Sequence, residues 1–189
     1  MAIARYIRIF NNMRNKVMQN RNITLAEITQ QSANDVIRSI YDANTEDQKL
    51  PVDKRTPISI IINSEGGDVY SGFGIVEAIL HSETPVYTIC HGQAQSMAML
   101  ILAAGHKRYI GSYSTLMYHE INWDVEFSPG KFHRQELDEA NRMQDIYDNL
   151  LLEFTNLTQQ QLLLIKNQGT YWYMNSEDAM RFGIVDESW

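Results

Sequence analysis

Cysteine is nearly absent from the sequence, and positive charge is in the minority. The single cysteine, Cys90, lies in the apolar segment 86–90, so an internal disulfide is excluded and a buried structural thiol is favoured over a reactive one. Lys and Arg number 16 against 23 Asp and Glu, a net charge of −7, and no long basic block occurs. We therefore expect a protein of a reducing, cytoplasmic compartment that does not bind nucleic acid.

Long hydrophobic runs are missing as well. The longest one, 97–104, falls well short of the ~20 residues that a helix needs to span a bilayer. Basic residues interrupt the apolar ones near the start of the sequence, a pattern unlike a signal-peptide core. We expect no membrane association, an N-terminal arm over residues 1–22 and one domain over 23–189, since a hydrophobic content of 44% allows a sizeable core.

Common motifs of nucleotide and metal chemistry are also lacking. No G-x-x-x-x-G-K-[ST] sequence occurs, so we expect that the chain does not hydrolyse ATP itself. His119 and Glu120 begin like a zinc-binding helix motif, but Trp123 stands where the second histidine is required and no Cys or His cluster replaces it. We expect neither a metal nor another cofactor. Ser96 lacks the flanking glycines of a nucleophile elbow, which argues against an α/β-hydrolase.

The apolar residues that are present follow strand-like and helix-like patterns in turn. The β-branched run 58–62 is typical of a strand buried on both faces, and Pro85 precedes a second strand at 86–90. Short alternating units of this kind predict an α/β domain with right-handed crossovers. Further strands are expected at 23–28, 107–110 and 115–118. Helices are expected at 96–104, 131–154, 158–165 and 176–183, together with one capped by Ser32 that carries Val36, Ile37, Ile40 and Tyr41 and one that carries Phe73, Val76, Ile79 and Leu80. The segment 44–57 is an expected surface connection.

The long expected helix, 131–154, differs between its two halves. Its second half carries an apolar stripe of Met143, Ile146, Tyr147, Leu150, Leu151 and Phe154, whereas its first half is much more polar. A helix of this kind either projects from its domain toward a partner or is an ordinary helix with a solvated start.

Three features of the sequence could carry chemistry. Ser96, at the beginning of the longest apolar run, either caps the following helix or acts as a nucleophile. Gly66 and Gly67, after a buried strand, form either a plain tight turn or half of an oxyanion hole, for which the Met97 amide could be the second donor. His119 closes an apolar strand, where α/β folds present catalytic groups, although alone it is more typical of a surface histidine.

Five motifs follow one another along the chain: 63–67 (NSEGG), 92–97 (GQAQSM), 103–105 (AAG), 117–119 (MYH) and 176–186 (SEDAMRFGIVD). As a set, they resemble the proteolytic subunit of Clp protease in their order and near-spacing. The resemblance runs from about residue 58 to residue 189. It implies a ClpP/crotonase-like fold of repeated ββα units, in which the helix after Lys131 is a protruding handle that docks two rings of subunits.

The resemblance also implies roles for individual residues. Ser96 is similar to the family's nucleophile, His119 to its general base, and the main-chain amides of Gly67 and Met97 to its oxyanion hole. The position of the catalytic aspartate holds Asn167. An asparagine carbonyl can accept the Nδ1 proton of a histidine and fix its tautomer, but it cannot supply the charge that stabilises an imidazolium.

Other departures from the family pattern surround the site. Asp124 or Glu126 could substitute for the missing aspartate. Glu65 stands where the family usually has proline, and residues 121–129 lack the family's glycine-rich handle strand. These changes bear on peptide binding and on contacts between rings.

The resemblance implies a serine-type endopeptidase that cleaves unfolded polypeptides inside stacked heptameric rings, a tetradecamer served by an ATP-driven AAA+ unfoldase. Asn167 motivates a second hypothesis, in which the chain is a catalytically weak or inactive ring subunit with a structural or regulatory role. A third hypothesis, an acyl-CoA enzyme of the crotonase fold, shares the glycine turn. It does not explain Ser96 together with His119.

Overall fold

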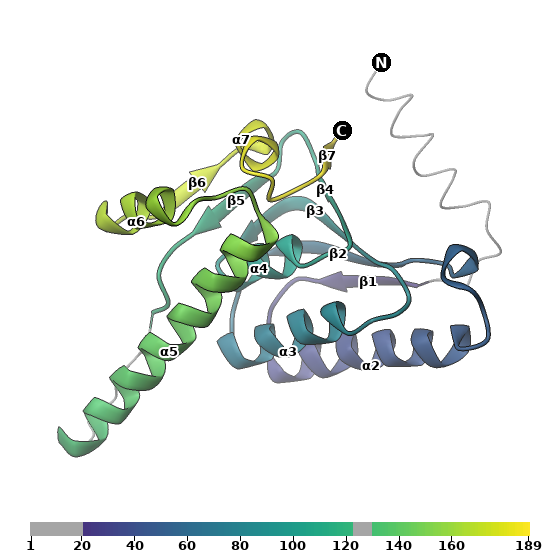
Figure 1. Cartoon of the computed structure of the whole chain (residues 1–189), viewed down its shortest axis with the longest axis horizontal. Helices are drawn as coiled ribbons and strands as arrows, with labels where there is room; N and C mark the ends of the chain where they lie inside the picture. The colour runs from purple at the N-terminus through teal and green to yellow at the C-terminus, as the bar shows by residue number, and fades with distance from the viewer. Residues whose placement is uncertain (1–20, 123–129) are drawn as a thin grey trace.

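The computed structural model describes residues 21–122 and 130–189, and within them the fold is built on a twisted, mostly parallel sheet (Figure 1). Its strands are β1 Asn22–Leu25, β2 Ile58–Ser64, β3 Val86–Gln95, β4 Lys107–Ile110, β5 Thr115–Tyr118, β6 Trp172–Met174 and β7 Glu187–Ser188. The order β1-β2-β3-β4-β7 is parallel throughout, β5 pairs in parallel with the end of β3, and β6 pairs antiparallel with β5. The expected α/β fold is confirmed.

Helices cover the sheet and connect its strands. They are α2 Gln30–Asp47, α3 Val69–Leu80, α4 Met97–Ala103, α5 Gly130–Phe154, α6 Gln159–Asn167 and α7 Ser176–Arg181, with a short 3₁₀ turn at Val52–Lys54. In Figure 1, α2 and α3 lie side by side, and α4 lies between the sheet and α5. Every residue of α4 is buried, which explains why this helix is apolar on all sides.

The central strand, β3, is longer than the sequence pattern predicts and carries the site at its end. Its first half pairs with β4 and its second half with β5, so that one strand joins two parts of the sheet. Its pairing with β2 shifts register between Ile62 and Ser64. Gly92, at φ +93°, makes room there, because a Cβ atom at this position would lie 2.8 Å from Oδ1 of Asn63. The strand thereby continues to Gln95 and ends directly before Ser96.

The beginning and end of α2 differ from expectation. Thr29, not Ser32, is the N-cap, because the two hydroxyls form a reciprocal capping box in which Ser32 is the third helical residue. The helix also continues into the expected surface connection and ends at Asp47, whose carboxylate is buried against the Arg21 guanidinium at 2.5 Å. Tyr41, expected on the core face, is 57% exposed.

The C-terminal part contains two strands that the sequence pattern does not reveal. β6 and β7 are three and two residues long, so neither carries a recognisable alternation, and only their pairing with β5 and β4 defines them. Thr158 caps α6 through a capping box with Gln161, as expected. The helix is less deeply packed than expected, however, because Leu163 and Leu164 are more than half exposed.

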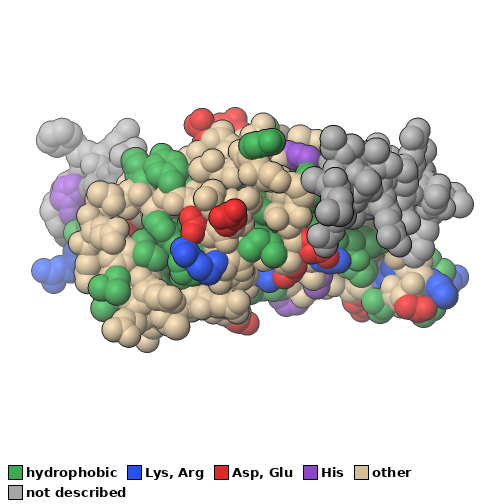
Figure 2. Space-filling view, turned by 90° about the horizontal axis from the view of Figure 1, so that it is seen from above, with side chains coloured by type: hydrophobic (Ala, Val, Ile, Leu, Met, Phe, Trp, Pro, Cys, Tyr) green, Lys and Arg blue, Asp and Glu red, His purple; other side chains and the backbone are tan. Residues whose placement is uncertain are grey.

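The long helix α5 begins at Gly130, one residue before the predicted start, and ends at Phe154, as the sequence predicts. Its second half packs on the domain through Met143, Tyr147 and Leu151, which are all buried. Its first half extends away from the sheet (Figure 1), which favours a projecting helix over an ordinary helix with a solvated start. On the face shown in Figure 2, basic side chains lie among acidic ones and do not gather in one region.

Candidate active site

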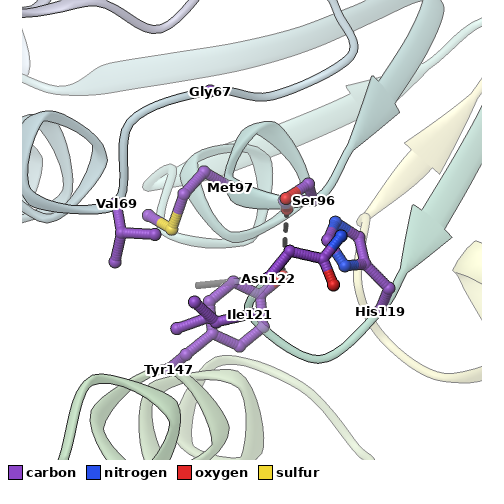
Figure 3. A pocket seen from close by; sticks show the side chains of 8 residues that line it. All are labelled: Gly67, Val69, Ser96, Met97, His119, Ile121, Asn122 and Tyr147. Atoms are coloured by element: carbon purple, nitrogen blue, oxygen red, sulfur yellow. Dashed lines mark hydrogen bonds between the residues drawn. The ribbon is translucent and has the colours of Figure 1, made fainter. Parts of the chain in front are cut away.

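A small pocket lies where three loops at the carboxyl ends of parallel strands meet α5 (Figure 3). Strand β2 leads into the first loop, β3 into the second and β5 into the third, which is where α/β folds collect functional groups. The residues that line the pocket are Gly67, Val69, Ser96, Met97, His119, Ile121, Asn122 and Tyr147. The fold therefore brings together the predicted nucleophile, base and oxyanion amides from positions 67 to 119.

Ser96 occupies the sharp connection between β3 and α4 in a strained conformation. Its φ of 53° and ψ of −129° are rarely adopted by side-chain-bearing residues, and in the described ranges it is the only non-glycine residue with positive φ. Its side chain makes no capping hydrogen bond, so the helix-cap interpretation is wrong. Strain of this kind concentrates at functional sites, because it costs free energy and persists only where the surroundings impose it.

The surroundings of Ser96 impose this conformation through its main chain. Its amide donates a 2.8 Å hydrogen bond to the carbonyl oxygen of Met117 in β5. Its own carbonyl oxygen accepts from the amide of Met99 at 3.0 Å and from the hydroxyl of Tyr147 at 3.0 Å, the bond drawn in Figure 3. Contacts from β5, α4 and α5 thus fix the main chain of Ser96.

The glycine turn after β2 approaches Ser96 so closely that no side chain fits. Gly66 and Gly67 have φ values of 108° and 142°. A Cβ atom on Gly66 would lie 2.7 Å from Cβ of Ser96, and one on Gly67 would lie 2.2 Å from the carbonyl oxygen of Ile28. Within the described residues, the amides of Gly67 and Met97 donate to no acceptor. Both remain available to an oxygen atom bound in the pocket.

His119 follows β5, and its ring points toward Ser96 in Figure 3. Its Nδ1 atom lies 2.5 Å from the main-chain carbonyl oxygen of Glu120. Because a carbonyl oxygen only accepts, this hydrogen bond requires a proton on Nδ1, and in the neutral imidazole Nε2 is then the acceptor. Tyr171 packs edge-on against the imidazole, with ring centroids 5.6 Å apart and an interplanar angle of 80°.

Asn167 is not among the residues that line the pocket. It is the last residue of α6 and its side chain is exposed. Its neighbour Lys166 approaches the histidine segment, with Nζ 3.6 Å from a carboxylate oxygen of Glu120. The alternative acids, Asp124 and Glu126, lie outside the described residues.

Tyr147 is a site residue that the sequence pattern does not identify as functional. Its spacing on α5 marks it as part of the apolar stripe, and it is indeed buried. Burial raises the pKa of the Tyr147 phenol, and the nearby Asp148 raises it further, so the hydroxyl stays protonated as a donor to Ser96. The one signal available in the sequence is that a buried tyrosine hydroxyl requires a partner.

Among residues 21–122 and 130–189, no three His, Cys, Asp or Glu side chains are grouped so that they could hold a metal ion. No helix in the same part of the chain combines the length and the apolar character needed to cross a bilayer.

A strained serine, a histidine hydrogen-bonded through Nδ1, and two amides with no acceptor among the described residues line one pocket at the ends of parallel strands. This is the layout of a serine hydrolase site. A family model described as Clp protease matches residues 7–188. The chain therefore belongs to the Clp protease family, and it is a serine-type, Clp-type peptidase subunit by that membership. The family resemblance of the sequence motifs is confirmed.

Curated relatives match most of the chain at moderate identity. The ATP-dependent Clp protease proteolytic subunit 1 of Prochlorococcus marinus is 28% identical over 174 residues, 90% of this chain and 84% of that protein. The ATP-dependent Clp protease proteolytic subunit of Deinococcus radiodurans is 30% identical over 74% of this chain and 70% of its own length. Subunit 2 of Chlamydia abortus is 31% identical over 85% of this chain and 75% of its own.

Proposed function

We propose that the chain is an active endopeptidase in which Ser96 is the nucleophile and His119 the general base. Ser96 Oγ bonds to a peptide carbonyl carbon while its proton passes to Nε2 of His119. The same proton then passes to the leaving amine as the C–N bond breaks, and water hydrolyses the acyl-enzyme by the reverse roles. The Gly67 and Met97 amides bind the oxyanion. The observation that carries the proposal is the strained Ser96 in one pocket with His119.

The size of the pocket supports a polymeric substrate. Its volume of about 150 Å³ is small beside the roughly 300–1,000 Å³ of sites that enclose a drug-sized ligand. It has room for the groups around one scissile bond and leaves the rest of a substrate outside. An extended polypeptide fits this arrangement better than a compact acyl-CoA does.

Asn167 is the proposed side-chain acceptor that shares the Nδ1 proton of His119 with the main-chain carbonyl of Glu120 during catalysis. The contact between its neighbour Lys166 and Glu120 supports this role, because it brings the end of α6 to the histidine segment. Without a negative charge, Asn167 stabilises the imidazolium of the transition state less than an aspartate does. We therefore expect a slow peptidase.

The proposed assembly is a pair of stacked heptameric rings, a tetradecamer, served by a separate AAA+ unfoldase. The projecting half of α5 supports contacts with another subunit, and the absence of a P-loop from the sequence means that ATP hydrolysis belongs to a partner. The relatives are named as ATP-dependent, which agrees with such a partner. Unfolded polypeptides are the proposed substrates, and the one buried cysteine, Cys90, fits a reducing cytoplasm.

A second candidate function is an inactive ring subunit with a structural or regulatory role. The specific observation in its favour is Asn167, which is exposed at the position of the family's aspartate and does not line the pocket. The positive φ of Ser96 favours the active enzyme, because a strained backbone costs free energy and an inactive site would gain no activity from it.

The test is intact mass after exposure to a fluorophosphonate, for the wild-type protein and the Ser96→Ala variant, with oligomer size recorded on the same samples. Stoichiometric labelling that disappears in the variant establishes an activated Ser96. A well-formed ring that stays unlabelled rejects the active peptidase in favour of the inactive subunit.

A further inference from the structure

A polar cluster of Gln144, Asp148 and Lys166 contacts the segment that carries His119. Gln144 and Asp148 are one helical turn apart on α5, and Lys166 belongs to α6. Asp148 is the centre of the cluster. Its Oδ1 atom accepts from Gln144 Nε2 at 2.8 Å, and its Oδ2 atom accepts from Lys166 Nζ at 2.6 Å.

This cluster contacts the chain on both sides of His119. Before the histidine, the hydroxyl of Tyr118 donates to Oδ1 of Asp148 at 2.9 Å. After it, the amide of Ile121 donates to Oε1 of Gln144 at 2.7 Å. Between them, Lys166 Nζ lies 3.6 Å from the carboxylate of Glu120.

The group that the cluster holds is the one that orients the imidazole. The main-chain carbonyl of Glu120 accepts the Nδ1 proton of His119, and it lies between two residues that the cluster fixes, Tyr118 and Ile121. A small displacement of this carbonyl would rotate the ring and move Nε2 away from Ser96. Catalysis is sensitive to such displacements, since a misplacement of about 1 Å can lower a rate about 10²-fold.

The cluster is shielded from solvent and internally compensated. The side chains of Asp148 and Lys166 are 13% and 24% exposed, so their charges are only partly screened by water. Burial lowers the pKa of Lys166, but the hydrogen bond and charge of Asp148 and the charge of Glu120 outweigh it and leave the pKa raised. The ammonium therefore remains charged, and removing it would leave the Asp148 carboxylate without its ion-pair partner.

We propose that Gln144, Asp148 and Lys166 are positioning residues that hold the Glu120 carbonyl as the acceptor for Nδ1 of His119. This inference rests on the proposed peptidase function and deepens it. The main chain thereby supplies the orientation that an aspartate side chain would give, in a chain that has Asn167 at that position. It explains how His119 keeps a usable tautomer although Asn167 does not line the pocket.

The test compares Lys166→Met and Lys166→Arg with wild-type protein in peptide cleavage and in the rate of fluorophosphonate labelling. We expect Lys166→Met to lower kcat and the labelling rate about 10- to 100-fold while KM changes less than about 2-fold. Lys166→Arg restores most of the rate, because a guanidinium can still bridge the two carboxylates. Gln144→Met, which removes the acceptor for Ile121 and keeps the side-chain length, lowers kcat in the same way.

The matched control is Lys107→Met, which breaks a 2.8 Å ion pair with Glu187 far from the pocket and is expected to leave kcat unchanged. Wild-type rates in Lys166→Met would overturn the positioning role. The positioning role would also be overturned if Lys166→Arg did not restore the kcat lost in Lys166→Met and the loss came with a lower melting temperature or a smaller ring. The cluster would then serve the stability of the fold and not the orientation of His119. Unlabelled wild-type protein would instead reject the peptidase function itself.

Discussion

The hydroxyl of Tyr147 on α5 donates a 3.0 Å hydrogen bond to the main-chain oxygen of Ser96, 51 residues earlier in the chain. Because the phenol is buried, this bond is shielded from water and restrains the serine at its positive φ. The helix α5 is therefore connected to both proposed catalytic residues, to Ser96 through Tyr147 and to the His119 segment through Gln144 and Asp148.

Replacing this tyrosine tests whether the bond matters for catalysis. Tyr147→Phe keeps the ring in the core and removes one hydrogen bond, which costs about 0.5–1.5 kcal/mol of stability. We expect the fluorophosphonate labelling rate to fall about 10-fold, because Ser96 samples other conformations. Tyr109→Phe, also buried but outside the pocket, is the control and should label at the wild-type rate. An unchanged rate in Tyr147→Phe would show that Met117 and Met99 hold the serine by themselves.

The strain at Ser96 can be measured by comparing two variants that lack its hydroxyl. Ser96→Gly removes the Cβ atom that makes a φ of 53° costly, whereas Ser96→Ala keeps it. We expect the glycine variant to be more stable than the alanine variant by about 1 kcal/mol, in spite of the greater flexibility of its unfolded chain. Denaturant unfolding of the two variants gives the difference, and a more stable alanine variant would mean that the conformation carries no strain.

Gly67 should tolerate no side chain, because a Cβ atom would lie 2.2 Å from the carbonyl oxygen of Ile28. We expect Gly67→Ala to displace the turn, to lower stability by about 1–3 kcal/mol and to abolish peptide cleavage. Gly169→Ala is a matched control, since it also has positive φ but nothing within 4 Å of the added Cβ atom. It should lose only about 1 kcal/mol and keep its activity. Equal effects of the two substitutions would contradict the close approach at Gly67.

Asn167→Asp tests whether the end of α6 takes part in the triad. If the side chain reaches His119 during catalysis, a carboxylate adds the missing charge, and we expect kcat to rise at least about 10-fold. Peptide cleavage and labelling rates measure the change, and Asn167→Ala shows what the amide itself contributes. A rate that is the same in all three proteins would leave the orientation of His119 to the Glu120 carbonyl alone.

The buried Arg21–Asp47 pair predicts a dependence of stability on pH. The hydrogen bond from Arg21 lowers the pKa of Asp47 below its usual 3.8 in the folded chain, against the opposing effect of burial. A lowered pKa means that the contribution is present above pH 3.8 and is lost as the pH falls through the folded-state value. We expect Asp47→Asn to lower the free energy of unfolding by about 1–3 kcal/mol at pH 7. The difference from wild type should shrink as the pH falls through the folded-state pKa of Asp47. Melting temperatures from pH 7 to pH 2.5 check it, and a constant difference would contradict the ionic contribution.

Sequence patterns predict the elements whose cause is local. The β-branched run 58–62 indicates a buried strand, the apolar run after Ser96 indicates a buried helix, and the stripe from Met143 to Phe154 indicates the packed half of α5; all three are confirmed. The Thr158 cap is confirmed for the same reason, since its partner is three residues away. The cap of α2 was displaced by three residues, because Thr29 and Ser32 carry the same kind of hydroxyl and only the backbone angles distinguish their roles.

The sequence by itself determined most of the helices and strands, the family and the candidates for the reactive side chains, because periodicity, capping and motif spacing are properties of neighbouring residues. The tertiary structure alone decided that Ser96 has a positive φ, that Tyr147 donates to it, and that Glu120 rather than a side chain accepts from Nδ1 of His119. It also decided the pairing of β6 and β7, which are too short to show a pattern. These features join atoms from distant segments, and their geometry follows only from how the whole core packs.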